Sequence, residues 1–421
     1  MDINEAVDPQ EQFFQRPGVE LDEIPIGEGI PIGIEKVSHP GSGIGGAYGT
    51  WGKEYDNASL FNFIAGALGK PIEKEEQMDL SSLGFVSRHH TSGLSDAEQL
   101  ELETDFGARL LRAAAHACGW EPQEVQGLLL GTSAPIANDF THRVASRAGI
   151  PDEALKVSVH KACDSSVGGL HLALNPSLSE NMRLKINIAR ELWGKKILVG
   201  GLEGLSRFVQ RSRDIFAYQL FGNGAGAIGV IPGKTLKFLV GKVYETFDEQ
   251  GVLAVHMTYP HSGKKAEGQS LVEVTEAGRD EYRVAGLMNE PQDGSSINMA
   301  GPMGMVKLFV RSGVQIVREV YLNYRGLMDE LGHFEKNIRV SIVHHANKKI
   351  NALKAKHLEN EGIQLSMPWI LSEFGNVSAA SNMIAFLRQL PAFTPGDHIL
   401  IDGFGAGTYY DVLAVEIGEA G

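Results

Sequence analysis

Cysteine and long apolar runs are both scarce in this chain of 421 residues. Its two thiols, Cys118 and Cys163, cannot build a disulfide framework, which argues against a small secreted scaffold. No stretch reaches the roughly 18 consecutive apolar residues that a membrane-spanning helix needs. Met1 leads into acidic, polar sequence instead of the basic and apolar segments of a secretory signal. We therefore expect a cytoplasmic protein with no membrane insertion.

Positive charge is also in short supply, since 38 Lys and Arg residues stand against 52 Asp and Glu residues, for a formal net charge of −14. This acidity opposes a general attraction to nucleic acid or anionic lipid, and we expect neither as a partner. The spacing of histidines and cysteines matches neither H-E-x-x-H nor paired C-x-x-C, so we expect no metal site. Hydrophobic residues make up 43% of the chain, enough for the full core of one large or two medium α/β domains.

Glycine, by contrast, is abundant, with 50 residues, many of them in short clusters between apolar runs that predict tight turns. Strand-like and helical segments alternate, in the order strand 125–134, helix 141–150, strand 156–162, helix 164–174 and strand 195–203. This alternation predicts a largely parallel sheet with helices on both faces, which is the α/β class. A second series of strand-like and helical segments follows later in the chain. We divide the chain into an acidic N-terminal arm (1–30), a first half (31–232) and a second half (233–421), and interpret the long tract 175–195 as an insertion.

Cys163 stands where the strand-like VSVHKA gives way to the helical DSSVGGLHLAL. If the helix begins near Asp164, its unpaired N–H groups and positive dipole end favour the thiolate, which makes Cys163 a candidate nucleophile. A buried, unreactive cysteine is the alternative. Strand-to-helix junctions are where α/β folds put reactive groups, and this position favours the nucleophile. Cys118, near the end of an alanine-rich helical segment, is predicted to fill core space instead.

Two other junctions have the same form. His344 and His345 follow the strand-like RVSIV, and Asn376 lies between MPWILSEF and a helical segment. Taken singly, a histidine at such a position can be structural and an asparagine can cap a helix. The carboxyl ends of parallel strands, however, meet at one edge of a sheet. We therefore expect the cysteine, a histidine and the asparagine to converge there. Two chemistries stay open. In a cysteine hydrolase the histidine is the base, whereas in acyl transfer imidazole and carboxamide N–H groups bind a developing enolate oxygen.

Glycine turns and a lysine cluster surround these candidates. GNGAGA at 222–227 leads into a strand-like segment, so we do not expect it to bind phosphate. GFGAG at 403–407 can direct backbone N–H groups into a pocket as an oxyanion hole. The segment after His344 carries four lysines, Lys348, Lys349, Lys354 and Lys356, that predict a cationic surface. Such a surface is either a solvated face or a docking site for a phosphopantetheine carrier, meaning coenzyme A or acyl carrier protein.

Taken together, these motifs resemble the thiolase superfamily, in particular β-ketoacyl-acyl-carrier-protein synthase III. The matching segments are KACDSSVGG at 161–169, FGNGAGA at 221–227, MAGPMGMVKLFVR at 299–311, HHANKK at 344–349, GNVSAAS at 375–381 and GFGAG at 403–407. They occur in the family's order and extend the likeness over roughly residues 31–418. The match selects His344, not His345, as the active histidine.

The resemblance implies a thiolase-like five-layered αβαβα fold built from two pseudo-duplicated halves, usually as a homodimer. It implies a decarboxylative Claisen condensation in which Cys163 is acylated by acyl-CoA and a malonyl thioester supplies the attacking carbanion. His344 and Asn376 would bind the enolate, and the backbone N–H groups of Cys163 and Ala406 the thioester oxygen. Lys348 and Lys349 would meet acyl carrier protein. No bound cofactor is implied, since acyl-CoA and the malonyl thioester are substrates.

Some positions depart from the family pattern. Asp164 follows the cysteine, and an acid there opposes thiolate formation if it faces the sulfur. His345 replaces a glutamine and Asn223 an aspartate. The sequence leaves open the acyl-chain length and whether the malonyl group is carried by protein or by coenzyme A. It also leaves open two other functions, a cysteine-dependent thioester hydrolase or acyl shuttle and a non-catalytic partner subunit.

Overall fold

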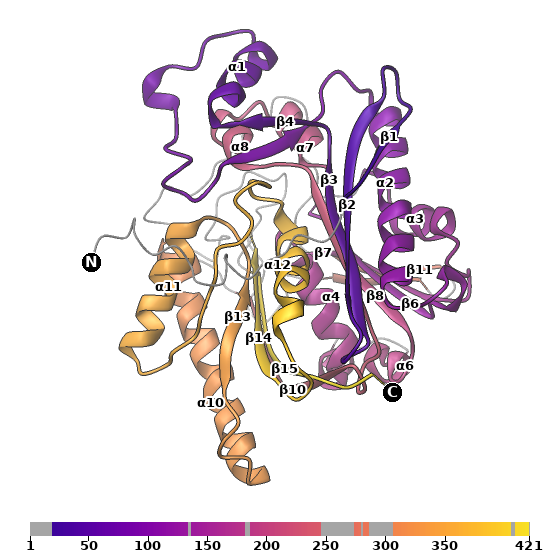
Figure 1. Ribbon diagram of the computed structural model, residues 1–421, viewed down its shortest axis with the longest axis vertical. Coiled ribbons are helices and arrows are strands. Elements are labelled where there is room, and N and C mark those ends of the chain that lie inside the picture. Colours follow the sequence, from indigo (N-terminus) through magenta and orange to yellow (C-terminus); the bar gives the residue numbers. More distant parts are fainter. Residues whose placement is uncertain are drawn as a thin grey trace.

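The computed structural model describes residues 19–133, 136–181, 186–245, 273–278, 281–285, 306–405 and 409–420, which form two main β-sheets with helices between and outside them (Figure 1). The strands are β1 (Val19–Ile24), β2 (Ile30–His39), β3 (Ile44–Trp51), β4 (Lys53–Asp56), β5 (Ser87–His90), β6 (Gly127–Gly131), β7 (Leu155–His160), β8 (Ile197–Glu203), β9 (Gly224–Val230), β10 (Leu236–Glu245), β11 (Glu273–Gly278), β12 (Glu281–Ala285), β13 (Ile338–Val343), β14 (His398–Gly405) and β15 (Tyr409–Ile417). The α-helices are α1 (Asn57–Leu68), α2 (Asp96–Ala117), α3 (Phe140–Ala148), α4 (Ser165–Leu174), α5 (Pro176–Asn181), α6 (Ile188–Leu192), α7 (Leu205–Ser212), α8 (Ile215–Leu220), α10 (Gly313–Leu331), α11 (Lys348–Asn360) and α12 (Ser381–Gln389).

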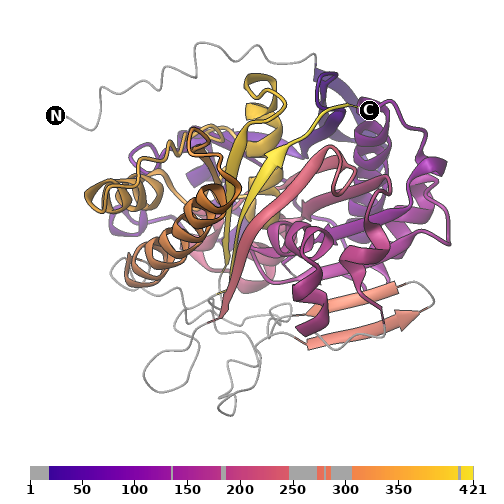
Figure 2. The same ribbon diagram turned by 90° about the horizontal axis from the view of Figure 1, so that it is seen from below.

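The larger sheet has the strand order β1-β2-β3-β9-β8-β6-β7-β12-β11. Its centre is parallel, because β6 pairs in parallel with β7 and β8, and β12 pairs in parallel with β7. The other pairs of this sheet, β1–β2, β2–β3, β3–β9, β8–β9 and β11–β12, are antiparallel, so the prediction of a largely parallel sheet is wrong for the sheet as a whole. Every residue of β6, β8 and β9 is buried, which explains why these strands read as nearly continuous apolar runs. The β11–β12 hairpin closes the outer edge of β7 (Figure 2).

The smaller sheet has the order β10-β15-β14-β13, in which β13 and β14 are parallel and the other pairs antiparallel. Helix α10 packs against β10 and β15 and against α11, so these two helices form the outer layer on this side (Figures 1 and 2). On the opposite side of the molecule, α2 and α3 cover the outer face of the larger sheet.

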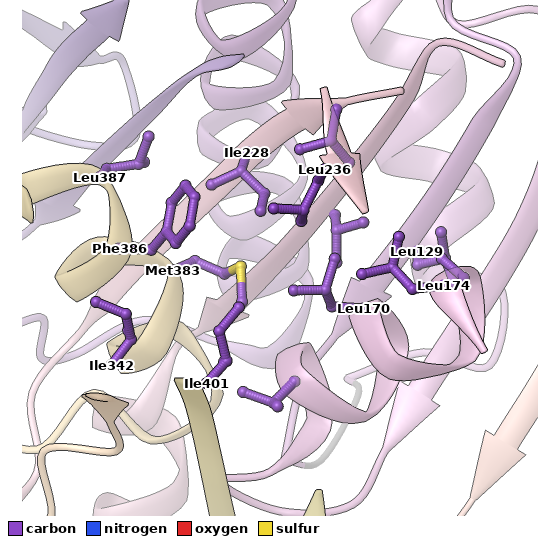
Figure 3. Close-up of a cluster of buried hydrophobic side chains, with 14 of the residues drawn as sticks. Leu129, Leu170, Leu174, Ile228, Leu236, Ile342, Met383, Phe386, Leu387 and Ile401 are labelled. Atoms are coloured by element: carbon purple, nitrogen blue, oxygen red, sulfur yellow. The ribbon is translucent and has the colours of Figure 1, made fainter. Parts of the chain in front are cut away.

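Helices α4 and α12 form the layer between the two sheets. Helix α4 contacts β6 and β8 of the larger sheet and β14 and β15 of the smaller one, and α12 contacts β3, β9 and β13. Every residue of both helices is buried, as expected for helices with a sheet on each side. Figure 3 shows Leu170 of α4 and Met383 and Phe386 of α12 packed with apolar side chains of both sheets. The predicted αβαβα order of layers is therefore confirmed.

The segments set apart in the sequence have definite places. Within the 1–30 arm, β1 pairs antiparallel with β2, while residues 1–18 lie outside the described residues. The 175–195 tract contains α5 and α6, and Asn187 caps α6 by accepting the N–H of Arg190. Within the described ranges, no helix is long and apolar enough to cross a membrane.

Candidate active site

Cys163 lies in a tight turn between β7 and α4. The preceding residue, Ala162, has a φ of 51°, a left-handed conformation that costs a non-glycine residue about 1–3 kcal/mol. Ser165 stabilises the turn, since its Oγ accepts the Lys161 N–H at 2.7 Å and donates to the Ala162 carbonyl at 2.6 Å. Helix α4 begins at Ser165 with Asp164 as its N-cap residue, which confirms the predicted start. The half-buried Cys163 thiol therefore lies at the positive end of the helix.

The side chain of Asp164 is engaged in a buried ionic cluster beneath this turn. Its Oδ2 lies 3.3 Å from Lys161 Nζ, and Lys161 also pairs with Asp411, which in turn binds His171 Nδ1 at 2.6 Å. Burial, and after it the charge of Asp411, raises the pKa of Asp164 well above its usual range. This shift favours the uncharged carboxyl, and Lys161 offsets the charge of the ionised form, so both effects reduce the penalty that the sequence position of Asp164 suggested.

His344 directly follows β13. Its backbone N–H donates to the Asp402 carbonyl at 3.1 Å, its Nδ1 lies 2.5 Å from Ser381 Oγ, and its ring meets Phe404 edge-on at 5.0 Å between centroids. Burial, with the nearby His345 and Lys354, lowers the pKa of His344 to about 3. The imidazole is therefore neutral near pH 7 and acts as a hydrogen-bonding group, not as a cation.

His345 points to a different part of the structure. Its Nδ1 lies 2.8 Å from the Val343 carbonyl, its Nε2 accepts the Ile370 N–H at 3.2 Å, and its ring lies 4.7 Å from that of Trp369. These bonds use both ring nitrogens. The choice of His344 over His345 as the candidate histidine therefore agrees with the contacts of both side chains.

Asn376 begins the segment that leads into α12. Its N–H donates to the Leu220 carbonyl at 2.7 Å, and its Oδ1 accepts the Ser378 N–H at 2.9 Å, which leaves Nδ2 as the donor on the other side of the amide. Ser378 has a φ of 44° and opens a 3₁₀ turn, Ser378–Ala380, before α12 starts at Ser381. Asn376 is thus not the N-cap of α12, which is Ala380. Its side chain nevertheless accepts the backbone N–H of Ser378.

The segment 376–381 links the three candidates. Ser378 Oγ lies 3.2 Å from Cys163 Sγ, Asn376 holds the Ser378 N–H, and Ser381 holds the ring of His344. Residues separated by more than 200 positions in the chain therefore meet around one short turn. Their catalytic roles stay a prediction at this point.

Close backbone packing brings the end of β14 to the same place. A Cβ atom added at Gly405 would lie 2.8 Å from the Lys161 carbonyl oxygen and 3.0 Å from the Cys163 nitrogen, so only glycine fits there. Ala406, the second predicted oxyanion donor, lies in 406–408, outside the described residues.

The predicted cationic surface on α11 is correct only in part. Lys348 and Lys349 are exposed in its first turn, where Lys349 Nζ donates to Ser82 Oγ at 2.8 Å, and Lys356 is exposed further along. Lys354 is fully buried and pairs with Asp402, so its assignment to the surface was wrong. An ammonium without water around it needs such a partner.

Sequence reasoning missed the polar residues behind the thiol. Ser133 Oγ lies 2.5 Å from Ser378 Oγ and 2.6 Å from Glu203 Oε1. Ser133 follows β6 and Glu203 ends β8, so both lie at the carboxyl ends of parallel strands. The same topological rule that selected Cys163 would have found them.

Comparisons with known proteins agree with this architecture. Residues 328–417 match the family model described as 3-oxoacyl-[acyl-carrier-protein] synthase III C terminal. The β-ketoacyl-[acyl-carrier-protein] synthase III of Neisseria meningitidis serogroup C is 25% identical over 356 residues, which cover 83% of this chain and 93% of the relative. The crystal structure of 3-oxoacyl-(acyl carrier protein) synthase III from Pseudomonas aeruginosa superposes with a TM-score of 0.58 at 20% identity, covering 93% of this chain and 98% of that one. The type III polyketide synthase domain of Steely1 from Dictyostelium superposes with a TM-score of 0.60 at 13% identity, covering 91% and 99%.

Proposed function

We propose that this chain, a β-ketoacyl-acyl-carrier-protein synthase III-like member of the thiolase superfamily, condenses an acyl primer with a malonyl thioester through an acyl group carried on Cys163. The chain is a condensing acyltransferase of the kind that serves fatty-acid or polyketide synthesis. The observation that carries the assignment to Cys163 is its contact with Ser378, on the same short segment that bears Asn376 and holds His344.

In the first half-reaction, the Cys163 thiolate attacks the carbonyl carbon of an acyl-CoA and the coenzyme A thiolate leaves. The start of α4 supports negative charge on the sulfur because its first N–H groups point toward the turn. The N–H groups of Cys163 and Ala406 bind the oxyanion of the tetrahedral intermediate. The close approach of Gly405 to the Cys163 nitrogen supports this arrangement.

In the second half-reaction, the malonyl thioester loses CO₂ and the resulting carbanion attacks the acyl group on Cys163. His344 Nε2–H and Asn376 Nδ2–H bind the enolate oxygen. Two contacts support these donors. Ser381 Oγ accepts the His345 N–H at 3.4 Å, so its own proton is available to His344 Nδ1, and Asn376 Oδ1 is occupied by the Ser378 N–H. One preorganised donor of this kind lowers a barrier by about 3–4 kcal/mol.

The carrier approaches over the first turn of α11. Lys348 and Lys349 are exposed there, and an acidic acyl carrier protein or the phosphates of coenzyme A would be attracted to them in an otherwise acidic chain. The enzyme works in the cytoplasm as a homodimer, with acyl-CoA and a malonyl thioester as its substrates and no bound cofactor.

The test is to incubate the protein with labelled acyl-CoA and with malonyl-CoA or malonyl-acyl carrier protein, and to follow three products. We expect an acyl adduct on Cys163 by mass spectrometry, release of CO₂, and a lengthened β-ketoacyl thioester. Acylation followed only by free acid would instead establish a hydrolase. If Cys163 takes up no acyl group from a panel of chain lengths, the proposed function is wrong.

A further inference from the structure

A hydrogen-bonded chain runs from the nucleophile into the protein interior. Cys163 Sγ lies 3.2 Å from Ser378 Oγ, which lies 2.5 Å from Ser133 Oγ, which lies 2.6 Å from Glu203 Oε1. The four residues come from the turn before α4, the segment before α12, the loop after β6 and the end of β8. The sequence-based site contains only the first of them.

Counting protons shows what this chain requires. It has three links, and each hydroxyl supplies one proton, so Ser378 and Ser133 fill only two links. The third proton must come from the Cys163 thiol or from the Glu203 carboxyl. The chain is complete either with a thiol and a carboxylate or with a thiolate and a carboxylic acid. Cys163 and Glu203 thus share one proton and one negative charge.

Glu203 is built into its position. It is 2% exposed, and its Oε1 also accepts the N–H groups of Ser133 at 2.8 Å and Ala379 at 3.1 Å. These bonds hold the carboxyl group in place, and they favour its ionised form. Burial raises the pKa of Glu203 to about 7, against the opposing effect of these hydrogen bonds, so both states are accessible near neutral pH.

Neighbouring elements bring other titratable groups to this carboxyl. Glu103 of α2 touches Gly204 and is paired with Arg207 of α7. His160 of β7 lies 3.1 Å from the Thr132 carbonyl beside Ser133, and burial lowers its pKa to about 4, so it is neutral. The Glu103–Arg207 pair is close to neutral as a unit, which leaves the shared proton as the local variable charge.

We infer that Glu203 is a positioning residue that accepts the proton of the Cys163 thiol through Ser378 and Ser133, an inference that rests on the proposed function. The S–H bond breaks and the proton passes to Ser378 Oγ. Ser378 gives its own proton to Ser133, and Ser133 gives its proton to Glu203 Oε1. The electron pair stays on sulfur, so the negative charge moves from the carboxylate to the thiolate. The steps reverse when the thiol is regenerated at product release.

His344 is a poorer acceptor for this proton. Its Nδ1 faces Ser381, and its strongly lowered pKa means that an imidazolium in this site is disfavoured. The structure therefore separates two tasks, with deprotonation of the thiol assigned to Glu203 and enolate binding to His344.

The test measures alkylation of Cys163 by iodoacetamide as a function of pH, with mass spectrometry assigning the label to Cys163 and not to Cys118. Two groups that share a proton titrate in two macroscopic steps, so the unmodified protein should show a rise, a plateau and a second rise. Glu203→Gln should show a single rise at higher pH, with the rate near neutral pH reduced about tenfold or more. Ser378→Ala should behave alike, because Ser378 carries the hydroxyl that contacts the sulfur and interacts with both Ser133 and Glu203, so its loss breaks every route between the thiol and the carboxyl.

Ser166→Ala is the matched control. Ser166 is buried and its Oγ donates to the Ala379 carbonyl, on the segment that binds Glu203, but it is not part of the chain. Its two-step profile should persist. A single rise at the same pH in the unmodified protein and in a folded Ser378→Ala variant overturns the inference. Alkylation needs no acyl substrate, so the alkylation profile tests proton transfer to Glu203 separately from condensation. A protein that shows the two-step profile but catalyses no condensation would refute the proposed function and leave the inference about Glu203 standing.

Discussion

Cys163 follows β7 in the larger sheet and His344 follows β13 in the smaller one, so both leave the carboxyl end of a parallel strand. Their surroundings differ. Cys163 is half-buried, sits after a left-handed Ala162, and its sulfur is reached by a serine hydroxyl. His344 is 1% exposed and is held by Ser381 and Phe404. The turn at Cys163 leaves the thiol able to become a thiolate, whereas the turn at His344 keeps the imidazole neutral.

The difference shows that equivalent positions in a two-sheet fold can be specialised by burial together with the hydrogen-bond partners and charges around each side chain. A nucleophile must be able to become an anion and reach substrate, whereas a donor to an enolate must stay neutral and keep its orientation. The thiol therefore lies where a proton can leave, and the imidazole where protonation is costly.

The largest effect on the difference between the two turns is expected from removal of the Cys163 sulfur. Cys163→Ala should abolish the acyl-enzyme completely, because no other group in the site can carry the acyl chain as a thioester. Intact-protein mass spectrometry after exposure to acyl-CoA measures this. Cys118→Ala, at the end of α2, is the control and should acylate normally, since burial raises the pKa of Cys118 to about 12. Acylation that survives in Cys163→Ala would refute the assignment.

Removing either neutral donor should separate the two half-reactions. His344→Ala and Asn376→Ala should still acylate Cys163 but release CO₂ from the malonyl thioester about 10²–10³-fold more slowly, because each loses one bond to the enolate. Single-turnover assays on pre-acylated protein measure this step alone. Unchanged CO₂ release in both variants would exclude these residues from decarboxylation.

The buried ion pair beside His344 should matter for stability. Lys354→Met leaves the Asp402 carboxylate buried without its partner and should lower the free energy of unfolding by about 3–5 kcal/mol, measured by urea denaturation. Lys356→Met, on the exposed face of the same helix, should change it by less than about 0.5 kcal/mol. Equal effects of the two substitutions would contradict the burial of Lys354.

The pH dependence should distinguish the two turns directly. The pKa of His344 is lowered to about 3, so its neutral form prevails above that value, and decarboxylation should not decline as the pH falls from about 7 to about 5. Acylation should decline over that range, because Glu203, with its pKa near 7, becomes protonated and no longer accepts the thiol proton. Rapid-mix measurement of each half-reaction tests this. A decline of both together would mean that one group controls both.

The smallest expected effect concerns the carrier. Lys348→Glu combined with Lys349→Glu should reduce the rate with malonyl-acyl carrier protein about tenfold at low salt, through slower association. Acylation by a short ester analogue without phosphates should stay unchanged. Lys356→Glu on the same helix serves as the charge-matched control. Equal losses with both substrates would indicate misfolding and not carrier recognition.

The sequence predicted the parts of this structure that depend on local pattern. The start of α4 after Asp164 is observed as expected. The error at Lys354 was avoidable, because Ile350, Lys354 and Leu358 are spaced by four and so share one buried helical face. The four lysines suggest a surface by their charge, whereas the helical periodicity places Lys354 on the buried face.

Other features could not come from local pattern. Glu203 closes an apolar strand and looks like an ordinary polar end of β8, and its partners Ser133 and Ser378 are 70 and 175 positions away. The left-handed conformation of Ala162 has no sequence signal either, since alanine does not favour it. Both depend on tertiary packing that brings separate strand ends together.

The strand that delivers the nucleophile is an interior strand, since β7 is hydrogen-bonded to β6 on one side and to β12 on the other. A slip of one residue in either pairing would turn its side chains to the opposite face, and two neighbours guard against that slip. Among the strands of the described ranges, the edge strand at this end of the sheet is β11 instead. Two copies that assembled by extending this sheet would join through β11, at least two strand spacings, or about 10 Å, away from the strand that carries Cys163.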